Sequence, residues 1–169
     1  DVCSSRSRDM ELSGVGLQGE PRERFQAIER ELAELSTRFA NNVIDSTKAW
    51  SMTLTQREEV DGLPPSALAM AAQAARQGLA EGAPAPTPEA GPWRITLDAP
   101  SFGPFMEHSR RSDLREKLYR AYITRASSGE QDNGPLIERI LTLRADKARL
   151  LGHGSFAEVS LAAKMAPGV

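Results

Sequence analysis

The chain has 169 residues, enough for one domain with a core of its own. Its net charge of −2 provides no cationic surface, so neither nucleic acid nor an anionic membrane is expected as a partner. The single cysteine, Cys3, excludes an intramolecular disulfide and a zinc site built from several thiolates, and it favours a reducing compartment. No apolar run approaches the ~20 residues of a membrane span. Residues 1–12 also lack the apolar stretch of a secretory signal.

A helix is predicted over Pro21–Thr47 and is the longest element of the chain. Its apolar residues recur at steps of three and four, the period of a single helical face. They are Phe25, Ile28, Leu32, Leu35, Phe39 and Val43. The opposite face is polar, so we expect one side of this helix to pack on later segments and the other to face water.

Two short strands are predicted, one on each side of a second helix. Residues 50–55 and 93–98 alternate apolar and polar side chains, the pattern of half-buried strands. The helix between them begins at Pro65 or Ser66. Residues 81–92, which are rich in proline and glycine, are predicted to form a surface loop. Pairing of the two strands would satisfy their backbone hydrogen-bonding groups.

The chain after the second strand is predicted to be helical. A turn or short helix begins over Pro100–Pro104. Ser112 is the expected N-cap of a helix that closes near Ser127–Gly129, because a serine at this position can accept a hydrogen bond from a free backbone N–H.

Two more helices complete the predicted order. The first runs from Pro135 to Leu151, and Ser155 with Glu158 forms a capping box for the second. The residues expected to point inward from the first of these are Ile137, Ile140, Leu141, Ala148 and Leu151. The chain is therefore predicted to be mainly α-helical, with a small two-stranded β element. With only 5% aromatic residues its core is thin, which indicates either close helix contacts or a larger parent structure.

The two histidines, His108 and His153, do not form an H-x-x-x-H pair that could hold a metal from one helical face. Each lies near a predicted helix end, where a structural or solvated role is expected for His108 and capping or plain exposure for His153. The residues alone therefore predict no catalytic residue and no metal ligand, and they leave the substrate-binding residues unidentified.

Other polar groups are predicted to be structural. Glu58 with Glu59, and Glu29 with Glu31, are surface carboxylates unless something desolvates them. The segment Ser13–Gly19 superficially resembles a phosphate-binding loop, but no strand precedes it and no G-K-[ST] follows, so we interpret it as a connector. The basic residues between Arg110 and Arg120 are interrupted by Asp113 and Glu116 and indicate a mixed-charge helix surface.

Several runs of sequence, in the same order, resemble one family of enzymes. The runs are Glu31–Thr47, Gly62–Pro64, Trp93–Phe102, Arg115–Ala126, Leu150–Gly152 and Ala157–Ala162. Together they are similar to the N-terminal half of oligopeptidase A and thimet oligopeptidase, which are zinc metalloendopeptidases that cut short peptides. The resemblance implies that residues 12–169 form an N-terminal helical lobe and one wall of a substrate channel. Residues 1–11 match less well.

The resemblance also implies where the chemistry lies. In this family an H-E-x-x-H helix binds zinc through its histidines, and its glutamate acts as a base toward the metal-bound water. The sequence contains no such motif. We therefore expect the zinc ligands in a catalytic domain beyond Val169, no zinc in this chain, and no activity of the chain alone. The implied partners are short unstructured peptides and that catalytic domain. The implied compartment is the cytoplasm, with a chloroplast or mitochondrial lumen as an alternative.

Two further functions remain open at this point. The chain could be a free-standing, non-catalytic helical module that binds peptides or a partner protein. A structural, coiled-coil-like protein is less well supported, because heptad spacing does not persist beyond the first helix.

Overall fold

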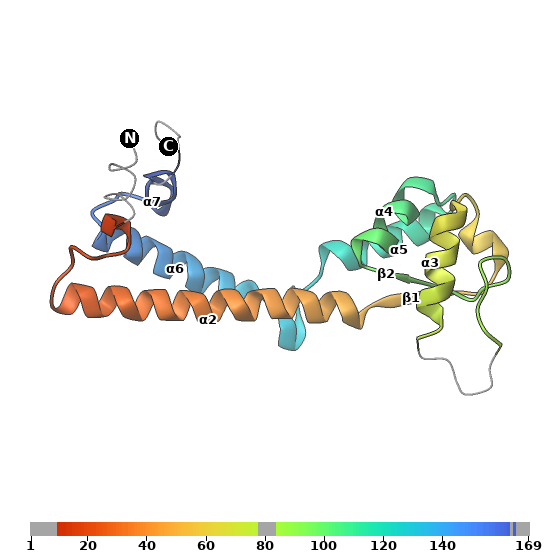
Figure 1. Cartoon of the computed structure of the whole chain (residues 1–169), viewed down its shortest axis with the longest axis horizontal. Coiled ribbons are helices and arrows are strands. Elements are labelled where there is room, and N and C mark those ends of the chain that lie inside the picture. The colour runs from red at the N-terminus through yellow and green to blue at the C-terminus, as the bar shows by residue number, and fades with distance from the viewer. Residues whose placement is uncertain (1–9, 78–83, 163, 165–169) are drawn as a thin grey trace. The chain divides into compact units, whose positions relative to one another are not determined.

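The structure is a computed structural model that describes residues 10–77, 84–162 and 164 (Figure 1). Cys3, most of the weakly matching segment 1–11 and the first residues of the predicted loop 81–92 lie outside the described residues. The described residues form a series of helices and one two-stranded sheet, so the predicted mainly α-helical class is confirmed. The chain divides into two compact units, one made of residues 1–40 and 133–169 and the other of residues 41–132.

The longest element is α2 (Glu20–Ala49), which extends the predicted helix Pro21–Thr47 by one residue at its start and two at its end. Glu20 and Glu23 lie in its first turn and Lys48 in its last, where their charges oppose those of the helix dipole. The predicted apolar face is present, but only Phe25 and Ile28 on it are buried. The remaining members of that face are partly exposed.

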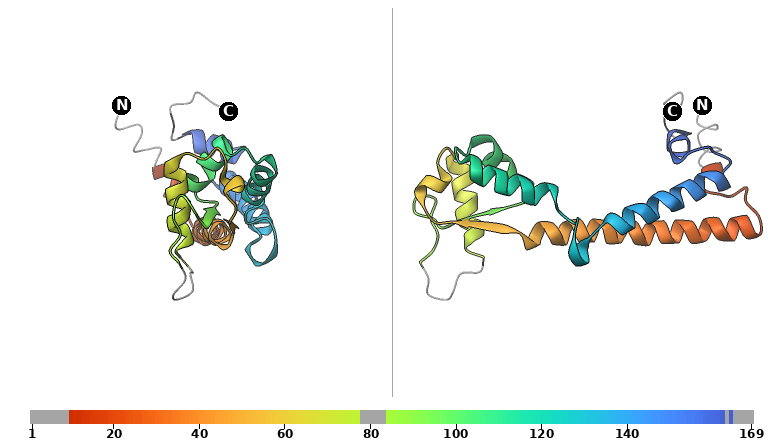
Figure 2. Two further views of the ribbon diagram at one scale, coloured as in Figure 1. Left: turned by 90° about the vertical axis from the view of Figure 1, so that its right-hand side faces the viewer. Right: turned by 180° about the vertical axis from the view of Figure 1, so that it is seen from behind.

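In the first unit α6 (Gly134–Leu150) runs beside the first part of α2, as two views of the ribbon show (Figures 1 and 2). Its buried residues are Leu136, Leu143 and Ala148. Of the residues predicted to point inward, Ala148 is buried, but Ile137 and Leu141 are 45% and 58% exposed, so the prediction is wrong for these two. Apolar residues cover more than half the circumference of this helix, and periodicity alone does not say which part of so wide a stripe meets the neighbour.

The turn from α6 to α7 (Phe156–Ala162) is fixed by backbone hydrogen bonds. His153 N–H donates to the Ala148 carbonyl at 2.9 Å and Gly152 N–H donates to the Arg149 carbonyl at 3.1 Å, the bonding pattern of a Schellman C-cap. Gly152 has φ 78°, a left-handed conformation that costs glycine little.

The predicted cap of the last helix is present in slightly altered form. Ser155 Oγ accepts from Glu158 N–H at 3.3 Å, while the Glu158 carboxylate accepts from Gly154 N–H at 2.9 Å, one residue before the cap. The Glu158 N–H at the start of α7 and the Gly154 N–H before the cap are thereby bonded, which defines where this short helix begins.

The second unit is built around the sheet. The strands β1 (Ser51–Leu54) and β2 (Trp93–Thr96) pair antiparallel, with Met52 opposite Ile95 and Leu54 opposite Trp93, which confirms the predicted pairing. These four side chains share one face and are 1–5% exposed. They form a core with residues of α3 (Pro65–Ala75), α4 (Ala99–His108) and α5 (Ser112–Ile123). Two short 3₁₀ helices, η1 (Arg57–Val60) and η2 (Gly129–Gln131), complete the unit.

The ends of α5 differ from those predicted. Arg111, not Ser112, occupies the N-cap position, and the helix ends at Ile123 rather than near Ser127–Gly129. Ala126 has φ 49° and donates its N–H to Ser46 Oγ at 3.0 Å, so a tertiary hydrogen bond takes this backbone out of the helix. This contact joins segments 80 positions apart in the sequence, and local patterns do not reveal it.

Candidate functional site

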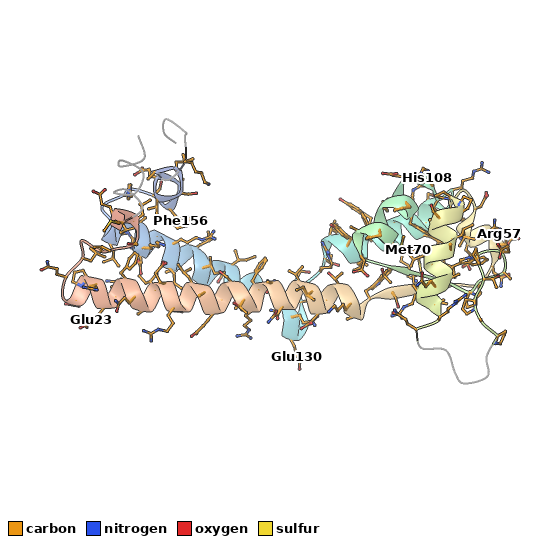
Figure 3. The ribbon with its side chains drawn as sticks, in the orientation of Figure 1. Glu23, Arg57, Met70, His108, Glu130 and Phe156 are labelled. Carbon is orange, nitrogen blue, oxygen red and sulfur yellow. The ribbon has the colours of Figure 1, made fainter. Side chains whose placement is uncertain are left out.

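Neither histidine lies in a group that suggests catalysis. His108 is the last residue of α4 and its side chain is 50% exposed, with Glu107 3.6 Å away (Figure 3). His153 lies in the turn after α6, with Nδ1 3.8 Å from Glu158 Oε2. Both side chains lie at helix ends, as expected from the sequence.

Glu29 and Glu31 on α2 are paired with cations of α6. Lys147 Nζ lies 2.7 Å from Glu29 Oε1, and Arg139 contacts both carboxylate oxygens of Glu31, at 2.6 and 2.8 Å. The hydrogen bond from Arg139 lowers the pKa of Glu31 below its ordinary value. A general acid at neutral pH needs the opposite shift, so this glutamate stabilises the helix pair and is unsuited to acid catalysis.

Glu59 has a structural role as well. Its carboxylate accepts hydrogen bonds from the backbone N–H groups of Gln56 and Thr55, each at 2.9 Å, and these bonds lower its pKa. The carboxylate thereby holds the backbone in place at the start of η1. Its neighbour Glu58 is exposed.

The four arginines between Arg110 and Arg120 are engaged with neighbouring groups. Arg110 pairs with Asp61 at 3.2 Å, Arg111 with Asp113 at 2.7 Å and Arg120 with Glu116 at 2.8 Å. Arg115 donates to the Ser109 carbonyl. The predicted mixed-charge helix surface is confirmed.

A shallow apolar groove lies between α2 and α6 in the first unit. It measures about 240 Å³ and is lined by Ser36, Phe39, Ile137, Ile140, Leu141 and Arg144. Ile137 and Leu141 are among the most exposed large apolar side chains of the described residues. This groove has few polar groups and can offer a partner mainly apolar contact.

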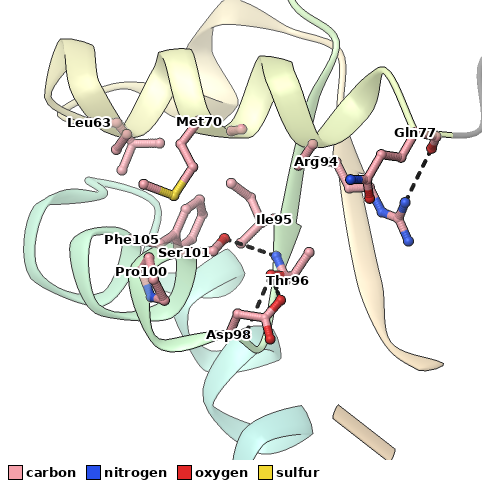
Figure 4. A pocket seen from close by; sticks show the side chains of 13 residues that line it. Leu63, Met70, Gln77, Arg94, Ile95, Thr96, Asp98, Pro100, Ser101 and Phe105 are labelled. Carbon is pink, nitrogen blue, oxygen red and sulfur yellow. Dashed lines mark hydrogen bonds between the residues drawn. The ribbon is translucent and has the colours of Figure 1, made fainter. Parts of the chain in front are cut away.

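A second hollow, of about 290 Å³, lies in the second unit between α3, β2 and the start of α4 (Figure 4). Its apolar lining comes from Leu63, Ala67, Met70, Ala71, Ala74, Ile95, Pro100 and Phe105. The Met70 side chain extends from α3 toward Phe105 (Figure 4). The other apolar residues that α3 contributes to the lining are Ala67, Ala71 and Ala74, whose side chains are small.

Polar groups surround one side of this hollow. Arg94 donates to the Gln77 carbonyl at 3.3 Å, and Thr96 Oγ1 donates to the Asp98 carboxylate at 2.9 Å. Ser101 Oγ accepts from the Thr96 backbone N–H at 3.0 Å. The hollow therefore combines an apolar floor with a polar rim whose charges already have partners, an arrangement suited to binding rather than to bond cleavage.

The sequence did not identify this hollow. The alternation of residues 93–98 predicted a strand. The alanines of the helix that became α3 predicted that another element can approach it closely. Which side of the strand α3 would meet depends on tertiary packing. Ser101 could have been noticed, since a serine in the first turn of a helix that follows a strand can accept from the strand's backbone.

The described residues include no group of three histidine, cysteine, aspartate or glutamate side chains that could hold a metal ion. No described helix is long and apolar enough to cross a membrane.

Comparison with known proteins shows close relatives. The chain is 50% identical over 165 residues to both the probable cytosolic oligopeptidase A and the organellar (chloroplastic/mitochondrial) oligopeptidase A of Arabidopsis thaliana, and these matches cover 98% of the chain. It is 42% identical over 164 residues to oligopeptidase A of Escherichia coli, with 94% of the chain covered. The chain spans 20–23% of the length of these relatives.

The sequence model of a peptidase family also matches part of the chain. Residues 105–168 match peptidase family M3, and the relatives extend the similarity over nearly the whole sequence. The resemblance seen in the sequence is thus confirmed by identities too high, over too long a stretch, to arise by chance. The chain belongs to peptidase family M3, in its oligopeptidase A group.

Proposed function

We propose that this chain is the non-catalytic, N-terminal helical lobe of a zinc metalloendopeptidase that hydrolyses short oligopeptides. Residues 12–169 form the lobe and one wall of the substrate channel. The observation that carries the proposal is the 42–50% identity to oligopeptidase A over at least 94% of the chain. Short peptides are the substrates, and the rest of the parent protein is the main partner. The parent acts in the cytosol or in an organelle.

Zinc and its ligands belong, in this proposal, to the rest of the parent protein. The sequence has no H-E-x-x-H motif, and the described residues offer no ligand set for a metal. The residues present do not fit a zinc site, so no catalytic step is assigned to them. Their role is to shape the space that a peptide occupies.

The groove between α2 and α6 supports this role. Ile137 and Leu141 leave apolar surface exposed, and in a longer protein further chain would cover such a surface. The ion pairs from Arg139 and Lys147 hold the two helices together beside it.

Two measurements test the proposal. The purified chain is analysed for zinc by mass spectrometry and assayed with internally quenched peptides, and we expect no stoichiometric zinc and no turnover. In parallel, the aligned segment of Escherichia coli oligopeptidase A is replaced by this chain, and we expect the chimera to bind zinc and cleave the same peptides. Zinc-dependent turnover by the chain alone, or a folded, zinc-loaded chimera without activity, would overturn it.

A second candidate is a free-standing helical module that binds peptides without cleaving them. The observation in its favour is the hollow beside β2, which has an apolar floor and polar rim but no catalytic group. The two candidates differ in the parent reading frame: an H-E-x-x-H motif downstream supports the peptidase, and a stop codon soon after residue 169 supports the module.

A further inference from the structure

We propose that the open edge of β2 binds an extended peptide, which adds as a strand beside β2 and places one apolar side chain in the hollow between α3 and α4. The inference takes peptides as ligands from the proposed function. Its test measures peptide binding and not cleavage. The inference can therefore fail while the proposed function stands, and the proposed function can fail while the inference stands.

The hollow lies along an edge of the sheet rather than over one of its faces. Three consecutive residues of β2, Arg94, Ile95 and Thr96, line it. Successive side chains of a strand point to opposite faces, so only a space along the strand's edge is reached by all three. The other edge of β2 is paired with β1. The hollow therefore follows the unpaired edge.

The direction of the backbone groups follows from one hydrogen bond. Thr96 N–H donates to Ser101 Oγ at 3.0 Å, so it points away from β1 and toward the hollow (Figure 4). In an antiparallel pair, residues alternate between those that bond the partner strand and those that face outward. Arg94, two residues earlier, therefore also directs its N–H and carbonyl outward, and Ile95 bonds β1.

One outward donor remains for a ligand. Pro92 has no N–H, and the N–H of Thr96 is already bonded to Ser101. Among the described residues no hydrogen-bond acceptor is assigned to the Arg94 N–H. Proteins commonly protect a strand edge with proline or with side-chain caps, and here that protection covers the positions on both sides of Arg94 but not Arg94 itself.

The chemistry of this edge selects an extended peptide as occupant. A strand's backbone offers the alternating acceptor and donor that the Arg94 N–H and carbonyl require, and its alternate side chains can enter a pocket. Met70, Ala74 and Phe105 make that pocket apolar. The Arg94 guanidinium and the Asp98 carboxylate already have partners, so a charged ligand gains little at this rim.

The test uses the whole chain and a fluorescein-labelled peptide of alternating valine and threonine, followed by fluorescence anisotropy. The key variant is Arg94→Pro, which removes the outward N–H but no hydrogen bond to β1. We expect it to bind about five- to tenfold more weakly, the effect of one lost hydrogen bond. Arg94→Ala keeps the N–H and separates the backbone effect from that of the side chain.

The matched control is Thr53→Pro on β1. Thr53 pairs with Arg94 in the register, so its N–H also faces outward, but on the opposite edge of the sheet. We expect Thr53→Pro to change binding by less than about twofold, since no bond to the ligand is lost. A second variant, Ala74→Trp, fills the hollow from α3 without changing any residue of the strand and should abolish binding. Circular dichroism melts confirm that each variant folds.

The proposal is overturned if the unmodified chain does not bind the peptide. It is also overturned if folded Arg94→Pro binds as well as the unmodified chain, if Thr53→Pro weakens binding as much as Arg94→Pro does, or if folded Ala74→Trp binds normally. Slower hydrogen exchange of the Arg94 amide on peptide addition would support it directly.

Discussion

Arg139 of α6 and Glu31 of α2 form a two-point ion pair across 108 positions of sequence, with Nε 2.6 Å from Oε1 and the second contact at 2.8 Å. Such a bidentate pair fixes direction as well as distance, because the guanidinium and the carboxylate are both planar. It sets how α6 lies along the first part of α2.

This pair makes stability depend on pH in a defined direction. The hydrogen bond from Arg139 lowers the pKa of Glu31 below its ordinary value, so the stabilisation is fully present above the pKa of the unfolded chain and is lost as pH falls through the lower folded pKa. We expect Glu31→Gln to be slightly less stable than the unmodified chain at pH 7, and this deficit to shrink as pH falls below the ordinary pKa of a glutamate. Urea unfolding at a series of pH values measures it. Glu34→Gln on the same helix is the control, and a deficit that persists unchanged at pH ~3 would contradict the assignment.

The core of the second unit should depend strongly on α5. Leu118 is fully buried, whereas Ile123 on the same helix is 55% exposed. Leu118→Ala should lower the free energy of unfolding by about 2–5 kcal/mol, because it leaves a cavity. Ile123→Ala should change it by no more than about 0.5 kcal/mol. Chemical denaturation of the two variants compares them, and similar losses would show that α5 packs through a different face.

The sequence predicted a helix or strand of this fold well where the pattern of apolar residues along that element was enough to identify it. The face of α2 is narrow and bordered by charged residues, so its periodicity identified Phe25 and Ile28 as packing residues. The alternation around Met52 and Ile95 identified both strands and suggested their pairing. These patterns succeed because burial acts on individual side chains along one element.

Prediction failed where the outcome depends on a contact distant in sequence. The inward face of α6 was placed too far toward Ile137 and Leu141, since leucine and isoleucine surround much of that helix. The end of α5 depends on Ala126 bonding Ser46. The free N–H of Arg94 depends on which edge of β2 meets β1 and on Ser101 capping Thr96. None of these relationships is present in a local pattern.

The C-terminal cap of α6 should be sensitive to a single methyl group. Gly152 has φ 78°, and an added Cβ there would meet open space, so any cost of substitution comes from the backbone alone. We expect Gly152→Ala to destabilise the chain by about 1–2 kcal/mol, the cost of a left-handed conformation for a residue with a Cβ. Gly16→Ala is the control, since its Cβ also meets open space and its φ lies outside the left-handed region. Thermal unfolding reports both, and equal effects would exclude the backbone explanation.

The exposed groove of the first unit should bind hydrophobic dyes. Ile137 and Leu141 lie one turn apart on α6 and present apolar surface beside Phe39 of α2. We expect the chain to increase the fluorescence of an anilinonaphthalene sulfonate dye, and the double variant Ile137→Lys, Leu141→Lys to reduce this increase without lowering the melting temperature. Both side chains line the open groove and are about half exposed, and neither belongs to the buried core, so the lysines should lose little packing. Leu143→Lys on the same helix is the contrasting variant: Leu143 is 3% exposed, and a charge there should unfold the first unit and raise dye binding. A chain that does not bind the dye, or a double variant that unfolds, would show that this face is already covered, and the proposed contact with the rest of a longer peptidase would lose its support.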